Sequence, residues 1–278
     1  ILIMALTNVL IAVKTYPTLS KEYDELVCTA GFLEDGSWVR IYPIPFRKLE
    51  NSSQYKKWQW ITIDLVRNSK DFRKESYRPV DIDKDILLGA EVPPVHNWRL
   101  RKPYALNEVY TNMDDLIEEA KRPPYKSLAV VKPLEIIDFI YEPVEREWDP
   151  KKLQSIYANQ AQLDLFDDDK RVAFQIVKKL PYKFSYVFTT EDGKRRTVMI
   201  EDWELGMLYW HCLEASGGDE KVACEKVRER YFNIMTKGKD FYFFMGTTKE
   251  FHIMAPNPFI IIGTFYPKKE DAELPLDF

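Results

Sequence analysis

Short segments rich in β-branched and aromatic residues, separated by turn signals, fill most of the chain up to Arg67. NVLIAVKT, ELVCTAGF, WVRIYPIP and WQWITIDLVR each have the composition of a strand, and Asp35-Gly36 provides hairpin-turn chemistry between the second and the third. Strands joined by such turns pair antiparallel, which favours a curved antiparallel sheet or a small barrel. We therefore predict a β-rich N-terminal part.

The second half combines strands with helices in an order that does not alternate regularly. Residues 68–107 are rich in proline and charge and are predicted to be extended loops, and Thr111 is expected to cap a short helix. Two strand runs flank Asp192-Gly193, two helices follow with a break at 216–218, and the apolar runs DFYFFMGTT and NPFIIIGTFYP read as closing strands. The order ββααββ favours the α+β class.

The predicted organisation has three parts. Residues 1–148 form the β-rich domain, residues 149–170 form a linker, and residues 171–278 form the ββααββ domain.

The bulk composition narrows the class of protein. The chain has 278 residues, 45% of them apolar, and a net charge of −4, so it can bury a large core but has no overall positive field to attract nucleic acid. Its three cysteines and three histidines form no zinc-site or disulfide pattern, which is typical of a reducing cytoplasm. No run approaches the roughly 20 apolar residues of a membrane helix, so we expect no membrane partner.

Basic and aromatic side chains are interleaved between residues 40 and 104. Arginines contact phosphates and exposed aromatic rings stack on unpaired bases, so this mixture is typical of nucleic-acid binding. The alternative is that the rings are the buried face of a sheet and the basic residues its solvated face. The predicted nucleic-acid-binding residues are Arg40, Tyr42, Arg47, Lys56, Lys57, Arg67, Arg73, Lys74, Arg78, Arg99 and Arg101.

Evidence for catalytic residues is weak. A nuclease would hold Mg²⁺ or Mn²⁺ with converging carboxylates, for which Asp64, Asp81 and Asp83 are candidates, whereas the D-x-K at 192–194 reads as a hairpin tip. His252 is expected to be exposed and is the better histidine candidate, because His211 lies among apolar helix residues. Otherwise no cofactor or resident metal is predicted.

The stretch NQAQLDLFDDDK places three apolar residues between glutamines and consecutive aspartates. Gln162-Leu163-Asp164-Leu165-Phe166 resembles the QL(S/D)LF pentapeptide of bacterial proteins that bind the DNA sliding clamp. The resemblance implies that Gln162 bonds at the rim of the clamp's binding site, that Leu163 and Leu165 make apolar contacts, and that Phe166 is the anchor. It covers these five residues only.

Two other interpretations of this stretch remain. Gln160, Leu163 and Phe166 also have the Q-x-x-L-x-x-F spacing of the archaeal and eukaryotic clamp-binding box, but Asp167 stands where that box usually has a second aromatic residue. Alternatively, residues 149–166 form an amphipathic helix that packs through Leu153, Ile156 and Leu163.

The sequence thus predicts a cytoplasmic, prokaryotic DNA-binding protein that the sliding clamp recruits for DNA maintenance, repair or defence against foreign DNA. Two alternatives stay open: a metal-dependent nuclease or base-acting enzyme, and a PUA-like RNA-binding protein.

Overall fold

Five strands of the N-terminal part close into a barrel in the computed structural model, which describes residues 3–20, 24–44, 46–49, 54–81, 86–164 and 176–270. The barrel order is β1-β4-β5-β7-β6, and β6 returns to pair with β1; only the β5–β7 pair is parallel. The barrel strands are β1 (Ile3–Lys14), β4 (Thr29–Phe32), β5 (Trp38–Ile41), β6 (Gln59–Arg67) and β7 (Ser76–Pro79).

The alternating pattern of the barrel strands fills the interior. Ile61, Ile63 and Leu65 of β6 point inward and pack with Val9 and Ile11 of β1. Gly31 of β4 pairs with Ile11, and a Cβ atom at Gly31 would lie 2.2 Å from the Leu10 carbonyl oxygen. A side chain at this position would therefore force β1 and β4 apart.

Several short strands and helices of the N-terminal part lie outside the five barrel strands. Residues 68–107, predicted to be loops, contain two strands and two short helices, so that prediction was wrong in part. The additional elements are β2 (Thr18–Ser20), β3 (Asp24–Leu26), η1 (Phe46–Lys48), β8 (Leu87–Glu91), α1 (Val95–Trp98) and α2 (Lys102–Ala105).

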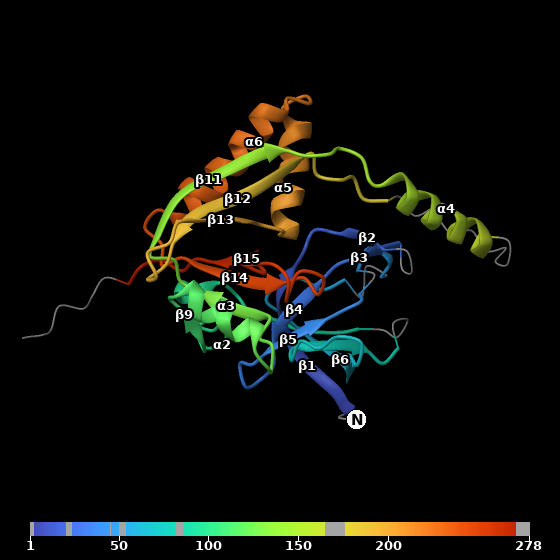
Figure 1. Cartoon of the computed structure of the whole chain (residues 1–278), viewed down its shortest axis with the longest axis horizontal. Coiled ribbons are helices and arrows are strands. Elements are labelled where there is room, and N and C mark those ends of the chain that lie inside the picture. Colours follow the sequence, from blue (N-terminus) through green and yellow to red (C-terminus); the bar gives the residue numbers. More distant parts are fainter. Residues whose placement is uncertain are drawn as a thin grey trace, which may run out of the picture.

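A four-stranded sheet lies against the barrel and is buried on both faces (Figure 1). Phe244 and Ile262 pack with barrel residues, whereas Phe243 and Ile261, one position earlier, pack toward the helices. Burial on both faces explains why these strands are continuous apolar runs in the sequence. The sheet order is β15-β14-β10-β9, formed by β9 (Val109–Tyr110), β10 (Leu128–Val131), β14 (Tyr242–Thr247) and β15 (Phe259–Phe265).

A third layer covers the other face of this sheet. The three-stranded sheet β11-β12-β13 and the helices α5 and α6 share one apolar core with β14 and β15. The remaining elements of the chain, of which α4 lies outside this core, are α3 (Met113–Lys121), β11 (Glu135–Pro143), α4 (Pro150–Asp164), β12 (Tyr182–Thr189), β13 (Arg196–Met199), α5 (Trp203–Ala215), α6 (Glu220–Arg228) and the π-helical turn η3 (Glu229–Ile234). None of the helices in the described ranges is both long and apolar enough to span a membrane.

The α+β class and the β-rich N-terminal barrel are confirmed. The predicted ββααββ order is present as β12, β13, α5, α6, β14 and β15, but the two strand pairs enter different sheets. β12 pairs with β11 and β14 pairs with β10. The strands β10 and β11, predicted to belong to the N-terminal part, therefore hydrogen-bond with strands of the C-terminal part. The N-cap of α3 is Asn112 rather than Thr111.

Candidate nucleic-acid interface

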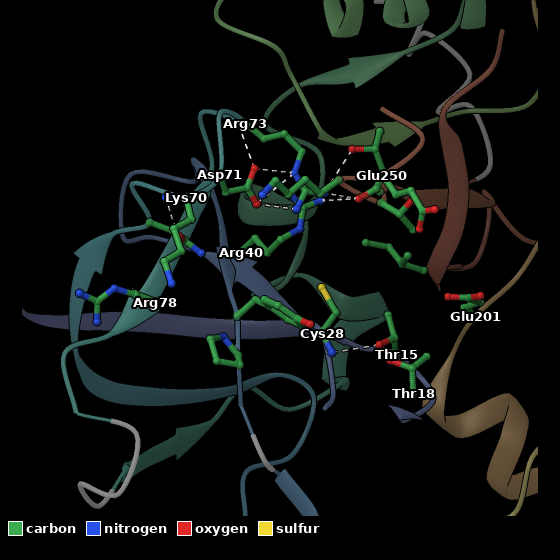
Figure 2. Close-up of a pocket in the computed structure, with 18 of the residues that line it drawn as sticks. Thr15, Thr18, Cys28, Arg40, Lys70, Asp71, Arg73, Arg78, Glu201 and Glu250 are labelled. Carbon is green, nitrogen blue, oxygen red and sulfur yellow. Dashed lines mark hydrogen bonds and ion pairs between the residues drawn. The ribbon is translucent and has the colours of Figure 1, made fainter. Parts of the chain in front are cut away.

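A pocket of about 830 Å³ lies between the barrel and the loop that follows β14 (Figure 2). Segments far apart in the sequence line it, including β5, the loop 68–73 after β6, residues 246–250 and Lys152 of α4. Its charged lining residues are Arg40, Lys70, Asp71, Arg73, Arg78, Lys152, Glu201, Lys249 and Glu250. The six cations outnumber the three carboxylates, so the pocket is a local positive site on a chain of negative net charge.

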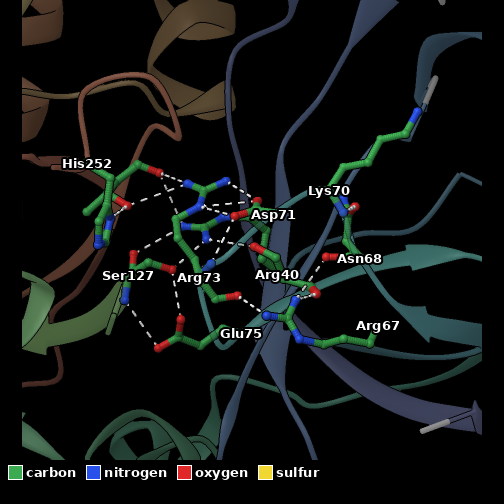
Figure 3. Close-up of polar contacts among 11 residues, drawn as sticks. Arg40, Arg67, Asn68, Lys70, Asp71, Arg73, Glu75, Ser127 and His252 are labelled. Atoms are coloured by element: carbon green, nitrogen blue, oxygen red, sulfur yellow. Dashed lines mark hydrogen bonds and ion pairs between the residues drawn. The ribbon is translucent and has the colours of Figure 1, made fainter. Parts of the chain in front are cut away.

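Arg40 lines the inner end of the pocket, since it is almost fully buried. Figure 3 shows its polar contacts. Its guanidinium donates to Ser127 Oγ at 2.6 Å, to the Ser127 carbonyl at 3.1 Å and to the Thr247 carbonyl at 3.3 Å. Ser127 Oγ in turn donates to Glu75 at 2.8 Å. This chain of bonds ties the barrel strand β5 to β10 and β14.

Arg73 approaches the same carbonyl from the loop after β6. It donates to Thr247 O at 2.5 Å and forms a buried ion pair with Asp71, with an Nη2–Oδ2 distance of 2.6 Å. Burial alone would raise the pKa of Asp71, but the hydrogen bonds and charge of Arg73 outweigh it and lower the pKa to about 2. Asp71 is therefore ionised at neutral pH and neutralises Arg73.

Four cations farther out have a different environment. Lys70, Arg78, Lys152 and Lys249 are exposed, and none of them forms an ion pair with a carboxylate in the described ranges. Their charges remain available to a bound anion. We call Lys70, Arg78 and Lys249 the rim cations.

Glu201 brings a carboxyl group to the wall of the pocket, on the side of α4 rather than of Arg78 (Figure 2). It is half-buried, and its side chain makes no hydrogen bond or ion pair with any residue that the structure describes. Burial raises the pKa of this carboxyl group. A ligand that enters the pocket therefore meets guanidinium charge at the inner end and the Glu201 carboxyl group at the side, and the exposed Glu250 lines the pocket as well.

Two family models match the chain, and the pocket is lined by residues of both matched regions. Residues 5–107 match a domain of unknown function, DUF8758, and residues 109–277, more than half of the chain, match a second domain of unknown function, DUF8757. The chain belongs to the DUF8757 family. No curated protein matches the sequence. The pocket is thus built jointly, because Arg40, Lys70 and Arg78 come from the DUF8758 region and Thr247 and Lys249 from the DUF8757 region.

Several of the predicted nucleic-acid-binding residues have partners inside the protein. The side chain of Lys57 is only 10% exposed and pairs with Asp202 at 2.7 Å and Glu204 at 3.0 Å in the DUF8757 region. Burial alone would lower the pKa of Lys57, but these two carboxylates outweigh it and raise the pKa. Lys57 therefore joins the two regions and is not open to solvent.

Arg67 and Arg101 are also engaged with the protein backbone. Arg67 donates to the Arg73 carbonyl at 2.8 Å, and Arg101 donates to the Val92 carbonyl at 2.9 Å. The guanidinium carbon of Arg101 lies 4.9 Å from the ring centroid of Trp58, and burial lowers the pKa of Arg101 to about 10. These two arginines support the loops from which they project.

The remaining predicted basic residues are scattered. Lys56 is exposed and pairs with Glu91 at 2.5 Å, Arg47 is half-buried, and Arg99 is exposed outside the pocket. Lys74 lies in a second hollow of about 460 Å³, which carboxylates of α3 also line. The pocket therefore unites only Arg40, Tyr42, Arg73 and Arg78 from the predicted set.

The aromatic side chains of the predicted cluster mostly pack in the cores. Phe46, Tyr55 and Trp58 are buried, as the alternative interpretation proposed. Tyr42 and Phe72 are the exceptions, with exposed fractions of 39% and 41%. Tyr42 lines the pocket.

The two histidine predictions were wrong about exposure. His252 is fully buried; its Nε2 donates to the Ala120 carbonyl at 2.7 Å, and its Nδ1 accepts from Thr247 Oγ1 at 2.7 Å. Burial lowers the pKa of His252, so it is neutral and structural at pH 7. His211, predicted to be a core residue, is exposed on α5.

Among the described residues, the structure does not bring the candidate metal-binding acids together. Asp64 is half-buried on β6, Asp81 is exposed, and Asp83 lies outside the described residues. Within the described ranges, no three His, Cys, Asp or Glu side chains gather closely enough to hold a metal ion.

The clamp-binding motif lies at the end of α4. Gln162, Leu163 and Asp164 form the last residues of this helix, whereas Leu165 and Phe166 lie outside the described residues. Residues 150–164 of the predicted linker are helical, and Ile156 is buried and Leu153 half-buried, as the amphipathic alternative predicted. The same helix supplies Lys152 to the pocket.

Sequence reasoning missed Lys152, Glu201 and Lys249 as lining residues. Each stands in a stretch with an ordinary local explanation: Lys152 in the first turn of a helix, Glu201 just before α5 and Lys249 in a loop between strands. Lys152 comes from α4, Glu201 is held beside β15 by its backbone bond to Ile261, and Lys249 follows β14, so only the tertiary fold brings them to one site.

Proposed function

We propose that the protein binds DNA through this pocket and that the replication sliding clamp delivers it to DNA through residues 162–166. The observation that carries the proposal is the convergence of Arg40, Lys70, Arg73, Arg78, Lys152 and Lys249 on one pocket with only three carboxylates. Its volume of about 830 Å³ is within the range of small-molecule and nucleotide sites. The rim cations supply phosphate contacts, and Tyr42 supplies an exposed ring for stacking.

Charge reversal at the rim tests the DNA-binding part. We expect the triple variant Lys70→Glu, Arg78→Glu, Lys249→Glu to lose DNA affinity and to show a flatter dependence of affinity on salt between about 50 and 200 mM. The matched control is Lys221→Glu, Lys226→Glu, Arg230→Glu, which makes the same charge change on exposed positions of α6 and η3. Fluorescence anisotropy with a labelled duplex measures both. Equal losses of DNA affinity in the two variants would show that binding depends only on net charge, and the pocket would then not be the DNA-binding site.

The clamp part has an independent test. A short peptide ligand concentrates its affinity in a few apolar anchors, so Leu165→Ala with Phe166→Ala should abolish capture by the host's sliding clamp. The unfolding midpoint of this variant should stay unchanged. A large loss of stability would instead place these side chains in the protein core. Tethering to a ring on DNA would raise the effective concentration of a weak DNA-binding surface, which suits a chain with net charge −4.

A second candidate function is chemistry on a DNA base, and the Glu201 carboxyl group favours it. An unpaired carboxyl group on a pocket wall, with a pKa raised by burial, has the properties of a general acid or base. Glu201→Gln keeps the shape of the side chain and removes its titration. If the protein alters labelled oligonucleotides, this variant should bind them normally and stop the reaction; unchanged turnover would exclude Glu201.

Competition experiments decide between nucleic acids. The proposal for DNA requires that unlabelled duplex DNA displace the labelled duplex more effectively than RNA of the same sequence. The reverse order would favour the RNA-binding alternative.

A further inference from the structure

The loop between β14 and β15 holds three apolar side chains out in solvent. Phe251, Ile253 and Met254 are 51%, 49% and 75% exposed. Single exposed apolar residues are common on protein surfaces, but three within four residues of one loop form a local apolar tip. We call these three residues the apolar tip.

Hydrogen bonds from Lys121 and His252 fix the loop beneath the tip. Lys121 Nζ donates to the carbonyls of His252, Ile253 and Ala255 at 2.8, 2.7 and 2.6 Å. His252, between two residues of the tip, is buried and hydrogen-bonded at both ring nitrogens. The tip is therefore preorganised, and a partner would not have to supply the free energy to order this loop.

The tip lies beside the mouth of the pocket. Thr247, Thr248, Lys249 and Glu250 line the pocket, and Phe251 follows them directly. The half-exposed ring of Phe72 lies between Asp71 and Arg73 in the sequence and packs edge-on against His252, with 5.2 Å between ring centroids. Along the chain, Phe251 thus lies two residues after the rim cation Lys249, and Phe72 lies two residues after the rim cation Lys70.

This neighbourhood favours one kind of partner. A protein partner or a lipid would use the apolar side chains but not the neighbouring cavity. Double-stranded DNA could use both, because its stacked bases can contact the apolar side chains and its phosphates can contact the cations. Proteins that distort DNA insert Phe, Ile or Met side chains between base pairs and compensate the unstacking by additional contacts with the bent DNA. Proteins that extrude a nucleotide need an adjacent pocket to receive it.

We propose that the apolar tip enters the base stack of duplex DNA and that the nucleotide displaced by it occupies the pocket between the barrel and β14. This inference rests on the proposed DNA binding. The rim cations hold the phosphates on either side of the displaced nucleotide, and Arg40 contributes positive charge at the inner end of the pocket.

A duplex that carries 2-aminopurine tests this step, because the fluorescence of this base rises when it leaves the stack. We expect a rise on binding to the natural protein and none with Ile253→Ser, Met254→Ser. The matched control is Leu134→Ser, since Leu134 is 70% exposed and follows β10 at the end of the sheet opposite to this loop. The tip variant should bind an intact duplex roughly tenfold more weakly, because it no longer compensates the unstacking cost.

The same variant should bind a duplex with an abasic site almost as well as the natural protein does, because that duplex has little stacking to lose. Equal weakening on intact and abasic duplexes, or salt-dependent binding without a fluorescence rise, would overturn the insertion while leaving DNA binding intact. Absence of salt-dependent DNA binding by the natural protein would overturn the proposed function as well. Loss of clamp capture by the tip variant would assign the tip to a protein interface instead.

Discussion

The cations inside the molecule and the cations at the rim of the pocket have similar chemistry but different partners. Arg73 is buried, pairs with Asp71 and bonds to a carbonyl of the opposite region, whereas Lys70, three residues earlier, is exposed with no ion-pair partner in the described ranges. Burial forces a charge to find internal partners, and a charge so satisfied has little left to offer a ligand. Structural and ligand-binding roles thus separate within one short loop.

The largest effect is expected from breaking an interior pair. Arg73→Met would leave the Asp71 carboxylate buried without its partner, which typically costs about 3 to 5 kcal/mol. Urea denaturation measures the free energy of unfolding. The double variant Asp71→Leu, Arg73→Met removes both charges and should recover most of the loss. A cost below about 1 kcal/mol for the single variant would contradict the interior role.

Lys14 is an interior cation whose surroundings do not fully compensate its burial. Its Nζ donates to the Tyr55 carbonyl at 3.1 Å and lies 4.4 Å from the ring centroid of Phe46. Burial, with a contribution from the charge of Lys57, lowers the pKa of Lys14 to about 8. The unfolded chain, where the lysine pKa is about 10.5, therefore holds more protons than the folded protein between pH 8 and 10.

Stability should accordingly rise with pH over this window, by up to about 3 kcal/mol. Lys14→Met keeps the length of the side chain, removes the titration and should flatten the dependence. Unfolding free energies measured at several pH values between 8 and 10 check this prediction. A slope that persists in Lys14→Met would assign it to other groups.

Local patterns in the sequence predicted the helices, strands and turns better than they predicted which strands pair with each other. The Asp192-Gly193 turn, the alternating strand β6 and the helices α5 and α6 were predictable because each depends on residues close in the chain. The pairing of β14 with β10 joins segments more than a hundred residues apart, and no local pattern encodes it.

The same limit applies to the site. Arg40 and Lys57 were predicted as surface cations because charge usually marks the solvated face of a strand or loop. Their partners, Ser127 and Asp202, lie in the other region of the chain, so the sequence does not show that they are buried. His252 was misassigned for the same reason, since its ring is held by Ala120, 132 residues earlier.

The smallest effect separates two lysines of one loop. Lys70 lines the pocket, whereas Lys74 lies in the second hollow beside Asp115, Glu118 and Glu119. A cation already surrounded by carboxylates contributes little to phosphate binding, so Lys74→Glu should change DNA affinity less than about twofold. Lys70→Glu should weaken it about tenfold and reduce the slope of log affinity against log salt by about one. Both variants carry the same change of net charge and should unfold at the natural midpoint, since both positions are exposed.

Anisotropy titrations at several salt concentrations compare the DNA affinities of the two variants directly. If Lys74→Glu weakened binding as much as Lys70→Glu, the DNA would follow α3 rather than the pocket, and the distinction between the rim and the rest of the basic surface would fail.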